Sequence, residues 1–281
     1  MNKEQYKLRQ EIVLKEEKNT TDLEKNIKNN YNLDIINITK NEDSSDGNVY
    51  NIKAKDNKYI MKIYSNKEKA ETMVNIHNSL NELYIPKIIM TKNNKYLLEI
   101  ENKYIIVYSF LEGKQISTYI KENNDKYNEE IIILIAKELK KFHDLTLNKK
   151  YNLKTIEFAN NLERQSVLHF DLTKENIFIK DDKIGFIDFD DAKYGDSVCD
   201  IGILLSFLFV SKKRGIDKDS IKVFLDNYYE NEELKNKELK FISKYITNWV
   251  DYIEDGHEFD SSLKDSFEFK KMNAKNIIDG L

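Results

Sequence analysis

Cysteine and proline are almost absent from the 281-residue chain, in which Cys199 and Pro86 are the only residues of these two types. A single cysteine can form neither an intrachain disulfide nor a cysteine-based zinc cluster, and this scarcity is typical of proteins from a reducing compartment. A single proline excludes a proline-rich linker between domains. We therefore expect a cytoplasmic protein without disulfides.

The chain also lacks a long apolar run and an excess of positive charge. Its longest apolar stretch, Ile201–Val210, has about half of the ~20 residues that a bilayer-spanning helix needs, and its first ten residues are mostly charged or polar. With 45 basic and 49 acidic residues, the chain offers no general basic surface for a nucleic-acid backbone. We expect neither membrane insertion, nor secretion, nor nucleic-acid binding.

Two kinds of apolar spacing divide the chain. Between Asp34 and Phe110, short runs rich in Ile, Val and Tyr alternate with turn-forming clusters, which predicts an antiparallel sheet interrupted by one helix near Lys67–Leu83. Beyond Gly113 the apolar residues recur at helical spacing, as in Glu129–His143. The pattern therefore predicts an α+β protein whose second part is mostly helical.

One short segment carries most of the functional information: its pattern is His169-x-Asp171-x-x-x-x-Asn176, a predicted β-hairpin, and then Asp188. Phosphoryl transfer needs a carboxylate near the attacking hydroxyl and oxygen ligands for the magnesium ion that bridges the phosphates. Asp171 can orient the acceptor hydroxyl and accept its proton, while Asn176 and Asp188, which the hairpin brings together, can coordinate the metal. We expect His169 to brace the loop rather than to take part in the chemistry.

Each residue of this pattern also has an ordinary structural explanation. His169 could be a core histidine, Asp171 a turn or capping residue, and the acidic residues after Asp188 part of a solvated loop. For any one residue alone this explanation is the better one, but the ordered combination within one segment favours phosphoryl transfer.

At these residues the chain resembles the aminoglycoside phosphotransferase and choline kinase superfamily, whose members share the protein-kinase fold. The resemblance extends over Ile35–Leu208, and its specific part is Val167–Leu205. It implies that Asp171 is the catalytic base, that Asn176 and Asp188 bind Mg²⁺, and that the phosphate donor is ATP.

The resemblance also implies a two-lobed α+β fold of the protein-kinase type. Residues 1–108 would form the nucleotide-binding lobe with one or two peripheral helices at its start, residues 109–113 the linker, and residues 114–281 the catalytic and acceptor-binding lobe. Asp200, which opens an apolar run, is expected to be structural, because an aspartate there can cap a helix and accept N–H bonds from neighbouring loops.

A eukaryotic-type protein kinase is the close alternative, because its H-R-D-L-x-x-x-x-N pattern differs only slightly from HFDLTKEN. Three details oppose it: Phe170 replaces the arginine, Asp190 replaces the glycine of D-F-G, and no A-P-E sequence follows. Since the usual peptide-docking segment is missing, we expect a small-molecule acceptor rather than a protein.

Two charged residues are expected to hold the nucleotide phosphates, a strand lysine and a helix glutamate that positions it. Lys62, in the β-prone run Tyr59–Tyr64, is the candidate lysine, although an exposed strand lysine would look the same. Glu71 is the candidate glutamate because it precedes Pro86 by fifteen residues, as in related sequences. Glu68, one helical turn away, is the runner-up.

The rest of the nucleotide site is predicted from loops. The turn Asn41–Asn48 contains a single glycine instead of a glycine-rich motif, and Ser44 within it is a candidate phosphate contact. Backbone groups of Ser109 and Leu111 in the linker are expected to meet the adenine edge. The expected cofactors are ATP, with GTP as the alternative nucleotide, and Mg²⁺.

The segment Tyr245–Phe269 is the candidate acceptor side. Seven of its residues are carboxylates and one is a lysine, and Tyr245, Trp249 and Tyr252 are interleaved with them. This combination suits a cationic acceptor, through charge-assisted hydrogen bonds and cation–π contacts. The alternative is a solvated helix face whose aromatic residues pack into the core.

Three functions fit these features. The first is an antibiotic kinase of the aminoglycoside type, which would confer resistance, and the second is a metabolic kinase of a small alcohol such as choline, ethanolamine, homoserine or a sugar. The third is a catalytically silent binding protein that keeps the kinase fold. The intact set of Lys62, Asp171, Asn176 and Asp188 argues against the third.

Overall fold

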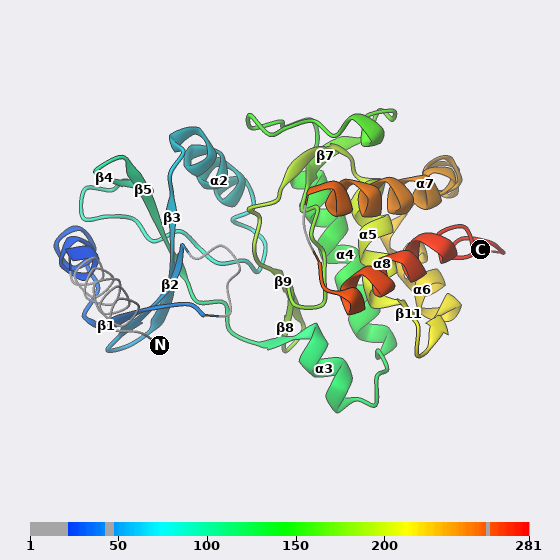
Figure 1. Ribbon diagram of the computed structural model, residues 1–281, viewed down its shortest axis with the longest axis horizontal. Coiled ribbons are helices and arrows are strands. Elements are labelled where there is room, and N and C mark those ends of the chain that lie inside the picture. The colour runs from blue at the N-terminus through cyan, green and yellow to red at the C-terminus, as the bar shows by residue number, and fades with distance from the viewer. Residues whose placement is uncertain (1–21, 43–47, 257–258, 281) are drawn as a thin grey trace, which may run out of the picture. The chain divides into compact units, whose positions relative to one another are not determined.

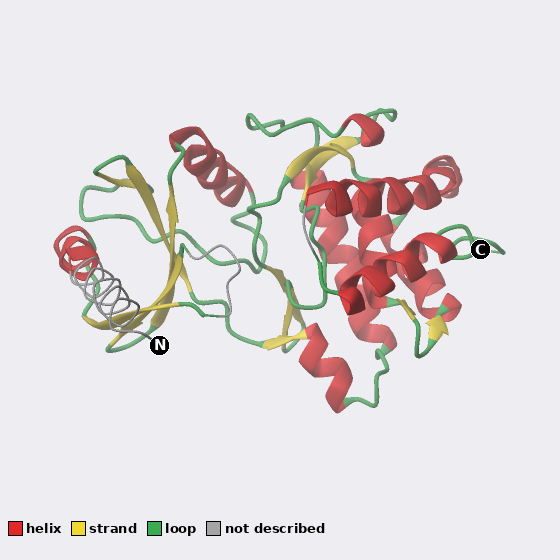
Figure 2. Ribbon diagram, in the orientation of Figure 1, coloured by secondary structure: helices red, strands yellow, loops and turns green. Residues whose placement is uncertain are grey.

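The structure is a computed structural model that describes residues 22–42, 48–256 and 259–280. The chain divides into two compact units (Figure 1). The first consists of the described residues up to Asn78 together with Pro86–Phe110, and the second of Ser79–Ile85 together with the described residues from Leu111 on. Strands dominate the first unit and helices the second (Figure 2).

A five-stranded antiparallel sheet forms the centre of the first unit, with the strand order β1-β2-β3-β5-β4. The strands are β1 (Ile35–Lys40), β2 (Val49–Ala54), β3 (Lys58–Tyr64), β4 (Leu98–Ile100) and β5 (Lys103–Ser109). Helix α2 (Lys67–Ser79) follows β3, and a further helix at residues 22–30 precedes β1. The predicted antiparallel sheet with one interrupting helix is confirmed.

Alternate residues of β3 point to opposite faces of this sheet. Met61 is fully buried in an apolar core, where it lies with Ile27 of the helix at residues 22–30 and with Tyr31 just beyond that helix. Lys62, the next residue along the strand, therefore lies on the opposite face, away from this core.

Helices make up most of the second unit. They are α3 (Ile116–Glu122), α4 (Glu129–Leu145), the 3₁₀-helix η1 (Glu157–Ala159), α5 (Val198–Leu208), α6 (Lys218–Tyr228), α7 (Glu232–Gly256) and α8 (Ser261–Asn273). Three small sheets, β6-β8-β9, β7-β10 and β11-β12, lie between them. Their strands are β6 (Lys114–Gln115), β7 (Gln165–Leu168), β8 (Ile177–Lys180), β9 (Lys183–Phe186), β10 (Lys193–Asp196), β11 (Val210–Ser211) and β12 (Gly215–Ile216).

Helix α4 shows how local sequence produces these elements. The side chain of Asn128 accepts a hydrogen bond from the backbone N–H of Glu130 at 2.9 Å and so caps the helix, while two glutamates in the first turn complement its dipole. Ile132, Ile135 and Leu139 recur at helical spacing and are buried. The helix predicted for this segment is confirmed.

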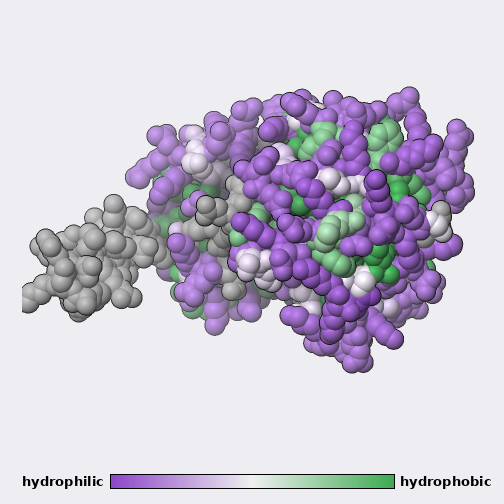
Figure 3. Space-filling view, turned by 45° about the vertical axis from the view of Figure 1, so that its right-hand side comes forward, coloured by the Kyte–Doolittle hydropathy of each residue, from purple (hydrophilic) through white to green (hydrophobic). Residues whose placement is uncertain are grey.

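The longest apolar run of the sequence becomes the buried helix α5, in which every residue except Phe207 is buried. Across the residues that the structure describes, no helix combines the length and the apolar character needed to cross a membrane. Hydrophilic side chains cover most of the face seen in Figure 3, as expected for a chain with 33% charged residues.

The hairpin β8-β9 forms where the sequence predicts it. Lys180 lies opposite Lys183, so Asp181 and Asp182 form a two-residue turn. Asp181 has a φ of 53°, the left-handed conformation that aspartate tolerates better than most residues. This tight connection returns the chain so that the loop before β8 and the loop after β9 meet.

Candidate active site

The loop that follows β7 is held in an uncommon conformation by two helices. Phe170 has a φ of 68°, which is rare for a residue with a large side chain. The carboxylate of Asp200 on α5 accepts hydrogen bonds from the backbone N–H groups of His169, at 2.6 Å, and Phe170, at 2.9 Å. The indole Nε1–H of Trp249 on α7 donates to the carbonyl of Phe170 at 3.0 Å. The residue before Asp171 is therefore fixed through both its N–H and its carbonyl.

Asp171 is held by Asn176 from the same loop. The side-chain Nδ2 of Asn176 donates to the backbone carbonyl of Asp171 at 2.9 Å and to its carboxylate at 2.7 Å. Burial is the largest effect that raises the pKa of the Asp171 carboxyl, and the charges of Asp191 and Asp188 act in the same direction. His169 and the hydrogen bond from Asn176 oppose this rise. The group is a positioned carboxylate whose affinity for a proton is increased.

Two contacts join the Asn176 loop to the Asp188 loop. The backbone N–H of Ile187 donates to the carbonyl of Asn176 at 3.0 Å, and Nε2 of His169 lies 2.8 Å from the carbonyl of Ile187. These bonds place Asp188, which has a φ of 65° and an exposed side chain, directly after a fixed residue. The position of His169 between the two loops fits the expected bracing role.

Oxygen atoms for a hard cation are present on both loops. Because Nδ2 of Asn176 is used by Asp171, the remaining side-chain atom of Asn176 is an oxygen, and Asp188 supplies a carboxylate. Within residues 22–42, 48–256 and 259–280, no group of three or more His, Cys, Asp or Glu side chains could hold a metal by itself. This donor set fits Mg²⁺, which binds one or two protein oxygens and completes its shell with phosphates and water.

Asp200 has the structural role that the sequence predicts. It is fully buried, and besides the two loop N–H groups its carboxylate contacts Nε2 of His143 on α4 at 3.3 Å. His143 in turn contacts the hydroxyl of Tyr228 on α6 at 2.7 Å. The sequence pattern does not single out His143 or Tyr228. The only signal was a histidine on the apolar face of a predicted helix, which is usually a packing residue.

In the first unit, Lys62 and Glu71 do not form the predicted pair. Glu71 is exposed on α2 and lines a cavity of about 600 Å³ together with Lys67 and Glu99, and within the described part of the chain it makes no ion pair. The reason is the direction of α2, whose buried side chains are those of Ala70, Thr72, Met73, Ile76 and His77. The runner-up, Glu68, is exposed as well.

His77 is the ionisable residue on the buried side of α2. Its ring packs against Tyr108 at 4.7 Å between centroids, and its Nδ1 lies 3.1 Å from the carbonyl of Pro86. Burial lowers the pKa of His77 to about 3, and the charge of Lys62 contributes to this decrease. A neutral imidazole therefore lies near Lys62, a feature that the sequence pattern does not indicate.

The predicted adenine contacts are partly used inside the protein. The backbone N–H of Ser109 donates to the carbonyl of Lys87 at 2.8 Å, and its Oγ accepts from the N–H of Lys87 at 2.8 Å. The side chain of Leu111 belongs to the core, and its backbone N–H donates no backbone hydrogen bond to any described residue. Ser44 lies outside the described residues.

The aromatic residues of the candidate acceptor segment differ in exposure. Tyr245 and Trp249 are buried, and the Tyr245 hydroxyl donates to the carboxylate of Asp196. Tyr252 is partly exposed and packs edge-on against Phe170 at 5.4 Å and near Phe158 at 6.3 Å. Tyr245 and Trp249 therefore pack into the core, which is the alternative role that the sequence pattern allowed for them.

The carboxylates of the same segment lie mostly at the surface. Asp251 is half exposed and forms an ion pair with Lys271, and Asp260 caps α8 by accepting from the N–H of Leu263 at 2.9 Å. Glu258 lies outside the described residues. The carboxylates that raise the pKa of Asp171 are instead those of Asp191 and Asp188, which follow β9.

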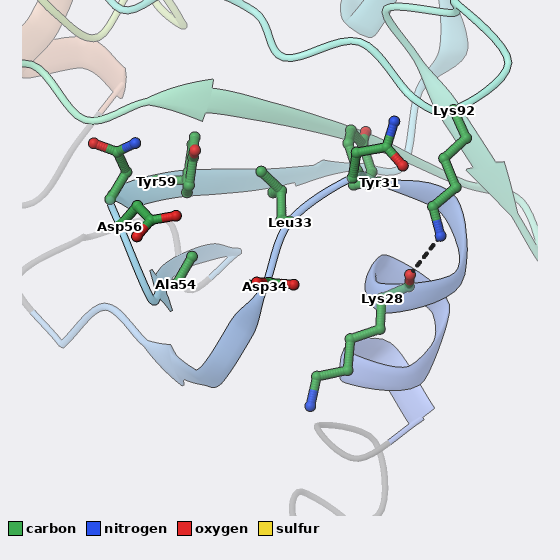
Figure 4. A pocket seen from close by; sticks show the side chains of 10 residues that line it. Lys28, Tyr31, Leu33, Asp34, Ala54, Asp56, Tyr59 and Lys92 are labelled. Carbon is green, nitrogen blue, oxygen red and sulfur yellow. Dashed lines mark hydrogen bonds between the residues drawn. The ribbon is translucent and has the colours of Figure 1, made fainter.

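A second cavity lies in the first unit, away from the Lys62 face. It has a volume of about 500 Å³, and Figure 4 shows its wall of lysine, aspartate and tyrosine side chains. Tyr59, on the same face of β3 as Met61, is part of this wall, and the ammonium group of Lys92 donates to the carbonyl of Lys28 at 3.0 Å. None of the predicted site residues lines this cavity.

Known protein sequences match parts of the chain. Residues 153–220 match the model of the phosphotransferase enzyme family, and this range contains the whole pattern from His169 to Asp188. A curated relative, the probable bifunctional tRNA threonylcarbamoyladenosine biosynthesis protein of Methanosphaera stadtmanae, is 33% identical over 117 residues. These cover 39% of the chain but 22% of the relative, so the chain spans about a fifth of that protein's length.

Solved structures show the same fold at low sequence identity. The AMP-bound spectinomycin phosphotransferase APH(9)-Ia matches with a TM-score of 0.66 and 14% identity over 92% of this chain and 98% of its own. The microcompartment-associated aminopropanol kinase matches with a TM-score of 0.63 and 11% identity, over 90% and 95% of the two chains. Choline kinase LicA from Streptococcus pneumoniae has a TM-score of 0.54 and 16% identity, over 89% and 95%.

These findings confirm the predicted resemblance and the predicted fold class. The fold is the kinase-like α+β fold of the aminoglycoside phosphotransferases and choline kinases. The part of the chain that matches the family model is the part that carries the phosphate-transfer pattern. Together they support a phosphotransferase.

Proposed function

We propose that this protein is a cytoplasmic kinase that transfers the γ-phosphate of ATP to a hydroxyl group of a small molecule, with Mg²⁺ as its cofactor. The observation that carries this proposal is the fixed carboxylate of Asp171, which Asn176 holds and which the hairpin places beside the loop of Asp188. Phosphoryl transfer requires positioning and electrostatics more than covalent chemistry, and this loop pair provides both.

Asp171 has the role of the base in this proposal. Its carboxylate orients the acceptor hydroxyl and accepts the proton that the hydroxyl loses as its oxygen bonds to phosphorus. The raised pKa of Asp171 increases its affinity for that proton. Asn176 keeps the carboxylate in one orientation, because its Nδ2 bonds both the side chain and the backbone of Asp171.

Asn176 and Asp188 would hold the magnesium ion through the Asn176 side-chain oxygen and the Asp188 carboxylate. When bound, the ion neutralises charge on the phosphate oxygens. Its site would be held together by the backbone bond between Ile187 and Asn176, since this bond keeps the two loops in contact.

Removing either proposed ligand tests the metal assignment. We expect Asn176→Ala and Asp188→Ala each to raise the Mg²⁺ concentration needed for half-maximal activity by about tenfold or more, because each change removes one oxygen ligand. Magnesium titrations of ATP turnover, together with calorimetric titration of MgATP, measure the effect. Asp182→Ala, in the exposed turn of the same hairpin, is the matched control. Titrations that are unchanged in both variants would place the metal elsewhere.

Lys62 is proposed to contact the α- and β-phosphates of ATP from the face of β3 that lies away from the apolar core. We expect Lys62→Ala to weaken ATP binding or lower kcat by about 10- to 100-fold, or roughly 1.4–3 kcal/mol, as for one positioned charge contact. Steady-state kinetics at varied ATP concentration measure this. Lys58→Ala, at the exposed start of the same strand, is the control. Unchanged ATP kinetics would show that another lysine serves the phosphates.

For the nucleotide itself, ATP is proposed rather than GTP, with the Leu111 N–H as one backbone donor for the base. Ser109 can contribute its carbonyl, because its N–H already bonds Lys87. Ser44 and Glu71 remain proposals for the phosphate side. For Glu71 the proposal requires a different side-chain arrangement from the one seen here, where Glu71 lines a cavity together with Lys67 and Glu99.

The proposed acceptor is a hydroxylated cation, either an aminoglycoside-type compound or a small amino alcohol. Two observations support a positively charged acceptor. Asp191 is exposed and close enough to raise the pKa of Asp171. Tyr252 and Phe158 present partly exposed ring surfaces around Phe170. Carboxylates beside aromatic faces attract cations. Aminopropanol and choline, which the names of two similar structures mention, are amino alcohols.

A panel of acceptors, read by ADP release in the presence of Mg²⁺ and ATP, tests the proposed function. Aminoglycosides, choline and ethanolamine represent the cations, sugars the neutral alcohols, and hydroxy acids the anions. Fastest turnover of an aminoglycoside would support an antibiotic kinase, and of choline or ethanolamine a metabolic one. If the best substrate is neutral or anionic, the proposed positive charge of the acceptor is wrong, but the proposed kinase activity stands. ATP binding without any turnover would favour a non-catalytic binding protein.

A further inference from the structure

A chain of four buried or half-buried polar side chains leads from the catalytic loop to helices α6 and α7. It starts at Asp200, which binds the N–H groups of the loop, and continues through His143 to the hydroxyl of Tyr228 at 2.7 Å. Nη2 of Arg164, the residue before β7, then donates to the Tyr228 hydroxyl at 2.9 Å. We call these residues the Arg164–Asp200 chain.

Every hydrogen bond of this chain is donated in the same direction, from Arg164 toward Asp200. A carboxylate can only accept hydrogen bonds, so Nε2 of His143 must carry the proton that lies toward Asp200. In a neutral imidazole Nδ1 is then an acceptor, and the Tyr228 hydroxyl donates to it. The oxygen of Tyr228 in turn accepts from Arg164. Burial lowers the pKa of His143, which agrees with the neutral form.

This direction matters because Asp200 is a fully buried carboxylate. Within the described ranges its only ion-pair contact is with His143, which is neutral, so no cation lies directly against it. A buried charge is costly unless hydrogen bonds stabilise it, and bonds in a chain polarise one another. The guanidinium of Arg164 is the cation at the far end of the chain, with its centre 5.1 Å from the Tyr228 ring.

Helix α7 anchors that cationic end. The carboxylate of Glu238 is almost fully buried, lies 3.5 Å from Nη1 of Arg164, and accepts a hydrogen bond from the Tyr229 hydroxyl at 2.7 Å. Arg164 also reaches Asp144 on α4, at 3.5 Å. The guanidinium therefore has a fixed place from which it orients the Tyr228 hydroxyl.

We propose that Tyr228 and Arg164 are positioning residues for the catalytic loop, acting through His143 and Asp200 on the peptide units that precede Asp171. Neither residue touches the reacting atoms. Their contribution is to hold the Asp200 carboxylate in the orientation that accepts from His169 and Phe170, and thereby to keep Asp171 aimed. The effect on turnover rests on the proposed kinase function, whereas the effect on the loop does not.

Replacing Tyr228 with phenylalanine tests this inference, because it removes one oxygen atom and little else. We expect faster amide hydrogen exchange at His169 and Phe170, whose N–H groups Asp200 binds. Hydrolysis of MgATP with water as the acceptor should slow about tenfold in kcat, while KM for ATP stays within about twofold, because the nucleotide contacts are unchanged.

Tyr31→Phe is the matched control. Tyr31 is also a buried tyrosine, but it lies in the core of the first unit, and its hydroxyl has no hydrogen-bond partner among the described residues. Its replacement should leave both readouts at the wild-type level. If Tyr228→Phe fails to fold, Arg164→Gln, which keeps an amide donor but loses the charge, takes its place in the same two measurements.

The two readouts separate the possible failures. Wild-type exchange at His169 and Phe170 in both Tyr228→Phe and Arg164→Gln would overturn the inference, whatever the kinetics. A proportional rise in KM and fall in kcat would also overturn it, because that would indicate general damage to the site. If the wild-type protein does not hydrolyse ATP with water as acceptor, the same kinetics are measured with the best acceptor of the panel. If neither water nor any acceptor of the panel supports turnover, the proposed function fails, and the exchange measurement still decides the role of Tyr228.

Discussion

Asp171→Asn is expected to lower kcat by about two to four orders of magnitude, the usual contribution of a general base. Asparagine has almost the same volume and keeps an oxygen for the Nδ2 of Asn176, so the loop should keep its shape. It cannot accept the proton of the acceptor hydroxyl. Turnover with the best acceptor of the panel measures the loss.

Two controls accompany this measurement. Binding of MgATP and the melting temperature should stay close to wild type in Asp171→Asn, and Asp182→Asn in the exposed hairpin turn should leave turnover unchanged. Wild-type kcat in Asp171→Asn would overturn its assignment as the base. A large loss of stability would instead show that the raised pKa of Asp171 reflects a structural carboxyl.

Asp200→Ala is expected to have the largest effect on stability, lowering the free energy of unfolding by about 3–5 kcal/mol. The substitution leaves three buried donors without an acceptor: the N–H groups of His169 and Phe170, and the Nε2–H of His143. Each unsatisfied buried group costs about 1–3 kcal/mol. Urea unfolding followed by circular dichroism measures the change.

The matched control for this prediction is Asp182→Ala, because Asp182 is an exposed aspartate in the same unit. A surface substitution of this kind should change the free energy of unfolding by no more than about 0.5 kcal/mol. Asp200→Asn, which keeps one oxygen acceptor, should fall between the two. Unfolding curves of Asp200→Ala that coincide with wild type would mean that the loop does not depend on this carboxylate.

The central part of the candidate site could be predicted because it is local in sequence. His169, Asp171, Asn176 and Asp188 lie in one loop–hairpin–loop unit, and a two-residue turn brings its ends together, although Asp200 and Trp249 fix the conformation of the first loop. Chemical type and spacing are then enough to indicate a function. The role of Asp200 followed from the same pattern, since it opens the apolar run that becomes α5.

The supporting residues could not be predicted because they meet only through tertiary packing. His143 is 57 residues from Asp200 and 85 from Tyr228, and Arg164 is 64 residues from Tyr228. Each of them alone has the appearance of an ordinary helix or loop residue. Their contacts depend on how α4 and α6 pack, which no sequence spacing specifies.

Glu71 shows a second reason why sequence-based prediction fails: spacing along a helix does not say which side of the helix is buried. Its distance from Pro86 in the sequence indicated which turn of α2 it would occupy but not which way that turn would face. The apolar residues decide the facing, and the buried side of α2 carries Ala70, Met73 and Ile76. Trp249 shows the converse, because an aromatic residue selected for an acceptor site serves to bind the carbonyl of Phe170.

The seven-residue segment Ser79–Ile85 means that neither unit corresponds to one continuous stretch of the gene. Its partners come from much later in the chain: Tyr84 forms a bridge with Gly185, and the carbonyl of Glu82 accepts from Lys141 at 3.2 Å. A side-chain carbon at position 185 would lie 2.4 Å from the Tyr84 carbonyl, so only glycine fits there. During synthesis, α2 and the strands of the sheet are complete before any of these partners has been translated. The second unit therefore cannot be expressed whole by a single cut after residue 110, and a fragment ending there would carry an apolar strip, Leu80, Leu83 and Ile85, without its cover.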